Sequence, residues 1–303
     1  MDFRKISLKD KGIFEEYLNL KGHKLSAYSF ANIYVWGRLF DISWSVIDSS
    51  LCVFFRDKIS TFLYLPPLCA GGFNPRAVNT VFNILARLNK NKLFSHIDNI
   101  EAEEEDFYRE IGYECLPASH EYFFLQGKLA QLKGGNFKSK RANCNFFRKH
   151  YDYVYTGLTQ GAAKECLELY KAWAEDKKRD IKDHLCRGML GDSFVVLKEA
   201  FKNYSALGFK GAAVKISGRL CAFTFGYAIN KYTFCILYEI ADLSFKGLAQ
   251  FIFREFSEEL KEYKFVNIMD DSGIDGLKRS KLSYHPEALV ASYSARLKNG
   301  QAY

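Results

Sequence analysis

The sequence predicts an α/β protein with layered helices and strands (α+β layered), in which one structural unit occurs twice in tandem. Strand-like apolar runs alternate with amphipathic stretches of helical spacing along most of the 303 residues, a pattern that indicates sheets covered by helices. A constant offset of 171 residues also pairs Phe82 with Phe253 and Asn99 with Asp270. Each copy is therefore expected to be a mixed, mostly antiparallel sheet flanked by helices.

The first half, residues 1–127, is predicted to contain the complete unit. Apolar spacing predicts helices over 12–20, 28–40, 75–89 and near 103–111, and strands over 44–47, 51–55, 61–65, 93–97 and 121–125. The helix that begins at Pro75 has a typical start. Asn74 can cap it, and proline lacks the N–H that the first turn leaves unbonded.

The second half, residues 151–303, repeats this order. Helices are expected over 162–175 and 192–207, followed by strands over 212–216, 220–229 and 232–240. Their two-residue turns are short enough to force antiparallel pairing. An amphipathic helix from Leu248 and a strand over 265–269 follow.

The two halves differ at the start of the helix in each unit. Residues 244–247 (Ser-Phe-Lys-Gly) precede the second helix, whereas the first begins at Pro75, which offers no N–H to a ligand. The first half is therefore expected to be structural, and the active site is placed in the second.

Composition limits the function classes. Hydrophobic residues make up 48% and the net charge is +8, so the chain can bury a large core and favours anionic partners such as tRNA, phospholipid head groups or coenzyme phosphates. The eight Cys and six His show no metal-ligand spacing, so no metal site is predicted. The N-terminus lacks an apolar leader and no apolar run approaches the ~20 residues of a membrane helix. We therefore expect no transmembrane segment and a cytoplasmic protein; the oligomeric state is left open.

A basic segment, residues 128–150, connects the halves. It has seven Lys or Arg up to Lys149 and no acidic residue, and a helix is expected from Asn136 after Gly134-Gly135. One interpretation is a phosphate-binding arm in which Lys140 and Arg141 contact the ligand, with the guanidinium as a bidentate fork. The alternative is a solvated linker helix.

Two short motifs resemble the catalytic domain of phosphatidylglycerol lysyltransferases. Residues 140–147 (KRANCNFF) carry an Arg and an Asn at the family spacing, here Arg141 and Asn145. Residues 276–281 (GLKRSK) with Pro286 match its C-terminal motif. Serines stand at 280 and 283, where the family has an aromatic residue and a second Lys.

This resemblance implies two tandem acyltransferase folds of the GNAT type and transfer of an aminoacyl group from aminoacyl-tRNA. The acceptor would be a small molecule or a lipid. The membrane-spanning half of those enzymes has no counterpart in the sequence. A second possibility is an acetyl-CoA or other acyl-CoA donor, held at Lys246, Gly247 and Ala249. Gly247 and Ala249 match the pyrophosphate motif of acyl-CoA enzymes, but Ser244 stands at its basic or amide position.

Aminoacyl transfer needs a proton acceptor, a grip on the donor ester and stabilisation of an oxyanion. Glu239, at the end of a predicted strand, is the candidate base, or else a strand-end carboxylate in solvent. Lys281 and Arg279 could polarise the ester or hold a phosphate, or be exposed helix residues. The remaining candidates are two carboxylates that bind an α-ammonium group or cap a turn, and two tyrosines that donate a proton or belong to the core: Asp270, Asp271, Tyr238 and Tyr284.

Three function classes therefore remain open. An aminoacyl-tRNA-dependent transferase would bind tRNA through residues 128–149. An acyl-CoA-dependent N-acyltransferase would bind its coenzyme at residues 244–249. A non-catalytic RNA- or anion-binding protein would bind anions and transfer nothing.

Overall fold

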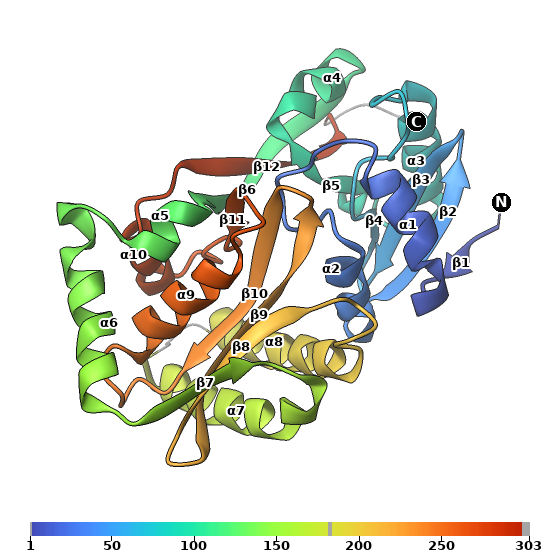
Figure 1. Ribbon diagram of the computed structural model, residues 1–303. Coiled ribbons are helices and arrows are strands. Elements are labelled where there is room, and N and C mark those ends of the chain that lie inside the picture. Colours follow the sequence, from blue (N-terminus) through green and yellow to red (C-terminus); the bar gives the residue numbers. More distant parts are fainter. Residues whose placement is uncertain (1, 181–183, 299–303) are drawn as a thin grey trace. The chain divides into compact units, whose positions relative to one another are not determined.

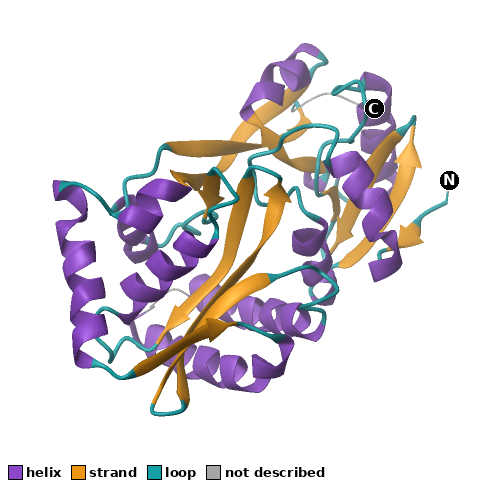
Figure 2. Cartoon of the chain, in the orientation of Figure 1, coloured by secondary structure: helices purple, strands orange, loops and turns teal. Residues whose placement is uncertain are grey.

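The computed structural model describes residues 2–180 and 184–298, which divide into two compact units (Figures 1 and 2). Unit 1 comprises Met1–Glu121 with Leu289–Tyr303, and unit 2 comprises Tyr122–Ala288. The predicted division into 1–127, 128–150 and 151–303 differs from this, because the last strand, β12 (Ala288–Leu297), pairs antiparallel with β5 (His96–Glu101) of unit 1. The boundaries of the two predicted repeats, 1–127 and 151–303, therefore stay a prediction. The α/β class is confirmed, since both units combine a mixed sheet with helices.

Unit 1 contains four α-helices among its described residues. They are α1 (Lys11–Leu18), α2 (Phe30–Val35), α3 (Pro75–Leu88) and α4 (Glu105–Glu110). Its strands run in the order β1 (Arg4–Lys5), β2 (Asp41–Ile47), β3 (Ser50–Arg56), β4 (Thr61–Leu63), β5 and β12. Strands β4 and β5 are parallel, because α3 crosses over between them.

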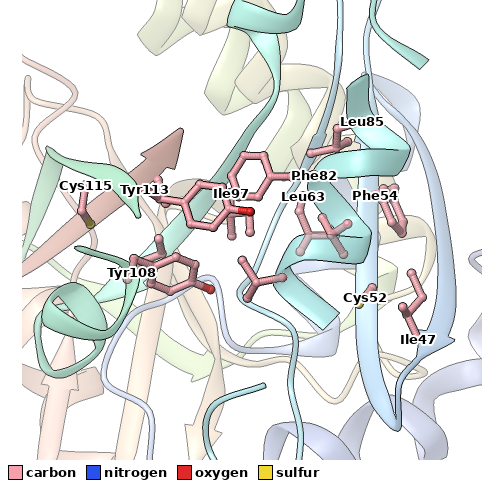
Figure 3. Packing of buried hydrophobic residues seen from close by; sticks show 14 residues of the cluster. Ile47, Cys52, Phe54, Leu63, Phe82, Leu85, Ile97, Tyr108, Tyr113 and Cys115 are labelled. Atoms are coloured by element: carbon pink, nitrogen blue, oxygen red, sulfur yellow. The ribbon is translucent and has the colours of Figure 1, made fainter. Parts of the chain in front are cut away.

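Helix α3 builds the core of unit 1, as the sequence predicts. Its start is the expected one, with the Asn74 side chain accepting a hydrogen bond from the Ala77 backbone N–H at 3.1 Å. The apolar face of α3 includes Phe82, which stacks on Tyr113 of β6 (Tyr113–Leu125) with ring centroids 4.2 Å apart (Figure 3). This stripe buries α3 against the sheet.

A buried ion cluster holds the chain between α1 and α2. The Glu101 carboxylate lies 2.9 Å from His23 Nδ1 and 3.0 Å from Lys21 Nζ, and it accepts the Lys24 backbone N–H at 2.8 Å. Burial opposes ionisation of Glu101. The bonds from His23 and Lys24 and the charge of Lys21 outweigh it and lower the pKa of Glu101 to about 2. One carboxylate thus fixes three residues of a loop that has no regular structure.

Unit 2 contains six α-helices among its described residues. They are α5 (Gln126–Gln131), α6 (Lys138–His150), α7 (Ala163–Asp180), α8 (His184–Lys202), α9 (Leu248–Glu259) and α10 (Asp275–Leu282). Its strands run in the order β7 (Tyr153–Gly157), β8 (Lys210–Ile216), β9 (Arg219–Asn230), β10 (Thr233–Ala241), β11 (Phe265–Asn267) and the end of β6. The predicted antiparallel meander is confirmed as β8–β9–β10.

The order of elements is the same in the two units. A strand and two helices lead into three antiparallel strands, then a helix, then a strand parallel to the third of them. Helix α3 holds this place in unit 1 and α9 holds it in unit 2. In unit 2, α7 and α8 cover one face of the sheet, and α5, α6 and α9 lie over the other (Figure 1).

We expect Glu101→Gln to lower the free energy of unfolding at pH 7 by about 3 kcal/mol, because the ion pairs lose their negative partner. A lowered pKa stabilises the fold above the ordinary carboxyl value of 4.5, and this stabilisation is lost as the pH falls through about 2. Urea unfolding measured from pH 7 to pH 2 should therefore show a shallower decline for the variant. Glu103→Gln, at an exposed carboxylate that pairs with Lys24 of the same loop, should stay within about 0.5 kcal/mol of wild type. Equal effects of the two changes would contradict this account.

Candidate functional site

Glu239 reaches the α9 side of the sheet through a β-bulge in β10. Ile236 pairs with Gly226 of β9, whereas Tyr238 pairs with Phe225, so Leu237 is an extra residue. Ile236 faces the core under α9. After the bulge, Tyr238 points to the opposite face, and Glu239 returns to the α9 side.

Gly226 makes this bulge possible. A Cβ atom at position 226 would lie 1.8 Å from the carbonyl oxygen of Cys235 on the neighbouring strand. No side chain fits at that distance, so only glycine allows the two backbones to approach so closely.

The Glu239 carboxyl is half-buried and has no hydrogen-bond or ion-pair partner among the described residues. Burial raises its pKa to about 8, although the nearby positive charges of Lys281 and Lys140 act to lower it. A carboxyl with this pKa can accept and return a proton near neutral pH.

Lys140 lies beside Glu239. Its Nζ is 4.1 Å from the centroid of the Tyr284 ring, a cation–π contact. Burial lowers the pKa of Lys140, against the opposing effect of the Glu239 charge. Burial also raises the pKa of Tyr284, with a further contribution from Glu239, and its hydroxyl has no hydrogen-bond partner within the described part of the chain. The structure therefore brings Lys140, Tyr284 and Glu239 together.

Lys281 holds the turn that follows β11. Its side chain is buried, and its ammonium group donates to the carbonyl oxygens of Ile268 (2.6 Å), Met269 (3.3 Å) and Asp270. An ammonium group has three hydrogens, and three backbone carbonyls accept them here. Lys281 therefore has a structural role, because these bonds fix the turn that carries the carboxylates of Asp270 and Asp271.

Asp270 and Asp271 lie in this turn. The Tyr122 hydroxyl, from β6, donates to Asp271 Oδ2 at 2.5 Å. Burial and this bond raise the pKa of Tyr122 to about 12. Each carboxylate also accepts a backbone N–H two residues later, from Ser272 at 3.3 Å and from Gly273 at 3.0 Å. The carboxylates therefore cap the turn, and Tyr122, which the sequence analysis does not predict as a site residue, contacts both Asp271 and Lys281.

Four of the predicted site residues are not shown to contact Glu239 or the 270–271 turn. Tyr238 is buried on the other face, where its hydroxyl donates to the Ser193 carbonyl at 2.6 Å. The Arg141 guanidinium donates to the carbonyls of Leu132 and Gly134, the latter at 2.7 Å, and so closes the end of α5. Arg279 and Asn145 are exposed on α10 and α6.

The predicted coenzyme site is covered by α6. Gly247 has φ = +87° at the start of α9, and a Cβ there would lie 2.1 Å from the Asn143 carbonyl oxygen of α6. The Leu248 N–H is bonded to the Phe245 carbonyl at 3.1 Å. Lys246 lies over the Phe146 ring of α6 at 4.6 Å, and Ala249 packs against the adjoining core. The Leu248 amide and the side chains of Lys246 and Ala249 thus contact protein.

The matching family model is "Phosphatidylglycerol lysyltransferase, C-terminal", which covers residues 19–296. The chain belongs to this family. No curated protein matches it. Among solved structures, a conserved protein of unknown function from Bacteroides thetaiotaomicron has a TM-score of 0.88 and 28% identity, over 98% of this chain and 100% of that one. L-PGS from Bacillus licheniformis has a TM-score of 0.66 and 16% identity, over 96% and 93%.

The fold is that of tandem GNAT proteins. A tandem GNAT protein from the clavulanic acid biosynthesis pathway superposes with a TM-score of 0.55 and 11% identity, over 99% of both chains. The predicted fold class is therefore confirmed, and the chain is an acyltransferase-type domain similar to those of phosphatidylglycerol lysyltransferases. None of the described helices has the length and apolarity of a membrane span.

We expect Lys281→Met to lower the free energy of unfolding by about 2–4 kcal/mol, because the substitution removes the donor to three carbonyl groups of the 268–270 turn, of which Met269 keeps the Tyr122 N–H at 3.1 Å. Chemical denaturation would measure the loss. Lys278→Met, on the exposed side of the same helix, is the matched control and should change stability by less than about 0.5 kcal/mol. An unchanged stability of Lys281→Met would show that the turn holds without the lysine.

Gly247→Ala should destabilise the protein by about 2 kcal/mol or more, since the methyl group meets the Asn143 carbonyl and the residue keeps a positive φ. Gly12→Ala is the control, because α1 leaves open space at that position and alanine favours a helix. Thermal unfolding of both variants tests the contact. A Gly247→Ala protein as stable as wild type would mean that α6 can move away from α9.

Proposed function

We propose that this protein transfers an aminoacyl group from aminoacyl-tRNA to a hydroxyl or amino group of a small or lipid acceptor, with Glu239 as the proton acceptor. The observation that carries the proposal is the Glu239 carboxyl, which has no hydrogen-bond or ion-pair partner among the described residues and whose pKa is raised to about 8 beside the desolvated Lys140. Perturbed pairs of this kind are typical of acid–base sites. Membership of the phosphatidylglycerol lysyltransferase family supports the same reaction class.

The chemistry follows from these groups. The acceptor oxygen or nitrogen attacks the ester carbonyl carbon, and its proton passes to the Glu239 carboxylate. The negative charge that develops on the carbonyl oxygen is stabilised by the Lys140 ammonium group, which has no carboxylate within ion-pair distance among the described residues. The bond to the ribose oxygen then breaks, and Glu239 returns the proton to that leaving oxygen.

The carboxylates of the 270–271 turn are suited to the donor's α-ammonium group. Asp270 bonds only weakly to Ser272, at 3.3 Å, while Asp271 is held by Tyr122. In this proposal Lys281 acts through the turn, since its three hydrogens are bonded to backbone carbonyls. Polarisation of the ester therefore falls to Lys140.

The acyl-CoA alternative has less support. Coenzyme pyrophosphate would need the N–H groups at the start of α9, where Gly247 touches the α6 backbone and Leu248 is bonded to Phe245. A coenzyme could bind there only after α6 moved away.

The test is transfer of a labelled aminoacyl group from charged tRNA to lipid vesicles or to small amines and alcohols. Because the base must be ionised, the rate should rise with pH up to the carboxyl pKa of about 8 and then level off. Glu239→Gln should lower the rate by about 10²–10⁴-fold and remove this step. Glu258→Gln, at an exposed carboxylate of α9, should leave both unchanged.

Stability separates a catalytic role from a structural one. A raised carboxyl pKa costs folding stability above pH 4.5, and the cost grows until the pH reaches about 8. Glu239→Gln should therefore be at least as stable as wild type at pH 8. An inactive, unstable variant would contradict the proposal, as would wild-type protein that transfers nothing from tRNA but is stabilised by acetyl-CoA.

A further inference from the structure

A hollow of about 540 Å³ in unit 2 is lined by the end of β6, by α5, by the loop that leads to α6 and by the loop between α9 and β11. Four of its lining residues are lysines and none is acidic: Lys128, Lys133, Lys261 and Lys264. The rings of Phe137 and Tyr263 and the side chains of two glutamines complete most of the lining. We call this feature the basic hollow.

Among the described residues, one of the four lysines of the basic hollow forms a salt bridge. Lys128 pairs with Glu287. Within the described part of the chain, Lys133, Lys261 and Lys264 make no salt bridge, although the charge of Lys261 acts on the adjacent Glu262, and Lys264 lies over the Phe265 ring at 5.1 Å. Glu262, which follows Lys261 in the chain, forms a salt bridge with Lys210 at 2.7 Å, and neither of these two residues lines the hollow. Three exposed ammonium groups thus converge on one hollow.

The composition of the lining favours a phosphodiester chain over a single tightly held phosphate. Lysine is a mobile point charge, and the hollow has no arginine fork of the kind that fixes one phosphate bidentately. Basic side chains interleaved with aromatic rings are typical of surfaces that follow a nucleic-acid backbone. The lysines come from three separate segments of the chain, an arrangement that also favours several phosphates over one.

The basic hollow is separate from the Glu239 cluster. Lys264 precedes Phe265, which pairs with Thr233, and Glu239 lies further along β10. At ~3.3 Å per residue the two sites are on the order of 20 Å apart. The unpaired 3′ end of a tRNA is long enough to bridge this distance.

We propose that the basic hollow binds the phosphodiester backbone of the RNA donor behind its aminoacylated end, through Lys133, Lys261 and Lys264. This inference rests on the proposed function, and it moves the phosphate contact away from Lys140 and Arg141, which face the interior and the end of α5. In this arrangement Lys140 stabilises the oxyanion, and the basic hollow binds the RNA phosphates.

The test compares binding of uncharged tRNA to wild type and to the double variant Lys261→Ala/Lys264→Ala at several salt concentrations. Each lost phosphate contact should reduce the salt slope by roughly 0.7–0.9, so the double variant should lose about 1.4–1.8 and bind roughly tenfold or more weakly at ~0.1 M salt. Lys58→Ala/Lys90→Ala, two exposed lysines of unit 1, removes the same charge and should keep the wild-type slope.

A second arm separates the hollow from the chemistry. Aminoacyl-adenosine carries the ester but no phosphate, so the double variant should use it at the wild-type rate while its KM for charged tRNA rises. Glu239→Gln should be impaired with both donors. Unchanged tRNA affinity and slope in the double variant would overturn the hollow and leave the proposed reaction standing.

Two further outcomes are decisive. Wild type that binds tRNA through the hollow but transfers from neither donor would support the hollow and overturn the proposed function. If the double variant loses binding to phosphatidylglycerol vesicles but keeps binding to tRNA, the hollow belongs to lipid head groups and the inference is wrong.

Discussion

One extra residue in β10 determines where the candidate base points. Without the bulge at Leu237, strand alternation would place Glu239 on the face covered by α7 and α8, where Tyr238 is buried. The bulge requires a close approach of two backbones, and Gly226 allows it. Gly226 on β9 therefore allows the bulge that turns the Glu239 side chain toward α9. Burial on that side raises the pKa of Glu239.

The second constraint is the position of α6. The helix backbone lies against Gly247, Phe147 packs on Phe251 at 4.8 Å, and Arg148 pairs with Glu255 at 2.7 Å. These contacts carry Lys140 into the interior, where it meets Tyr284. The same contacts cover the start of α9. One packing arrangement therefore supplies a desolvated cation to the site and covers the helix start that a coenzyme would need.

The sequence predicted the architecture more completely than the site. Helix periodicity and capping were sufficient for α3, because Asn74 and Pro75 act locally. The same holds for the meander, whose turns are short. Glu239 and Asp270 are also candidates from the sequence because each stands at the end of a predicted strand, and Lys281 because it belongs to the motif at residues 276–281. Their roles could not be derived, since the bonds of Lys281 depend on a turn with a positive φ at Met269. Tyr122 was missed as a site residue because its contact with Asp271 joins residues 149 positions apart.

The basic segment shows why charge in a sequence does not locate charge in space. Residues 128–149 are continuous in the chain, yet the structure separates them: Lys128 and Lys133 line the hollow, Lys140 turns inward and Arg141 closes α5. The other lysines of the hollow are Lys261 and Lys264, which in the sequence look like an ordinary helix end and the start of a strand. A desolvated lysine with a lowered pKa would be a poor partner for a mobile polyanion, and an exposed lysine would be a poor stabiliser of an oxyanion. Burial therefore divides one basic segment into two kinds of cation, and the difference in solvation is what suits each to a separate step.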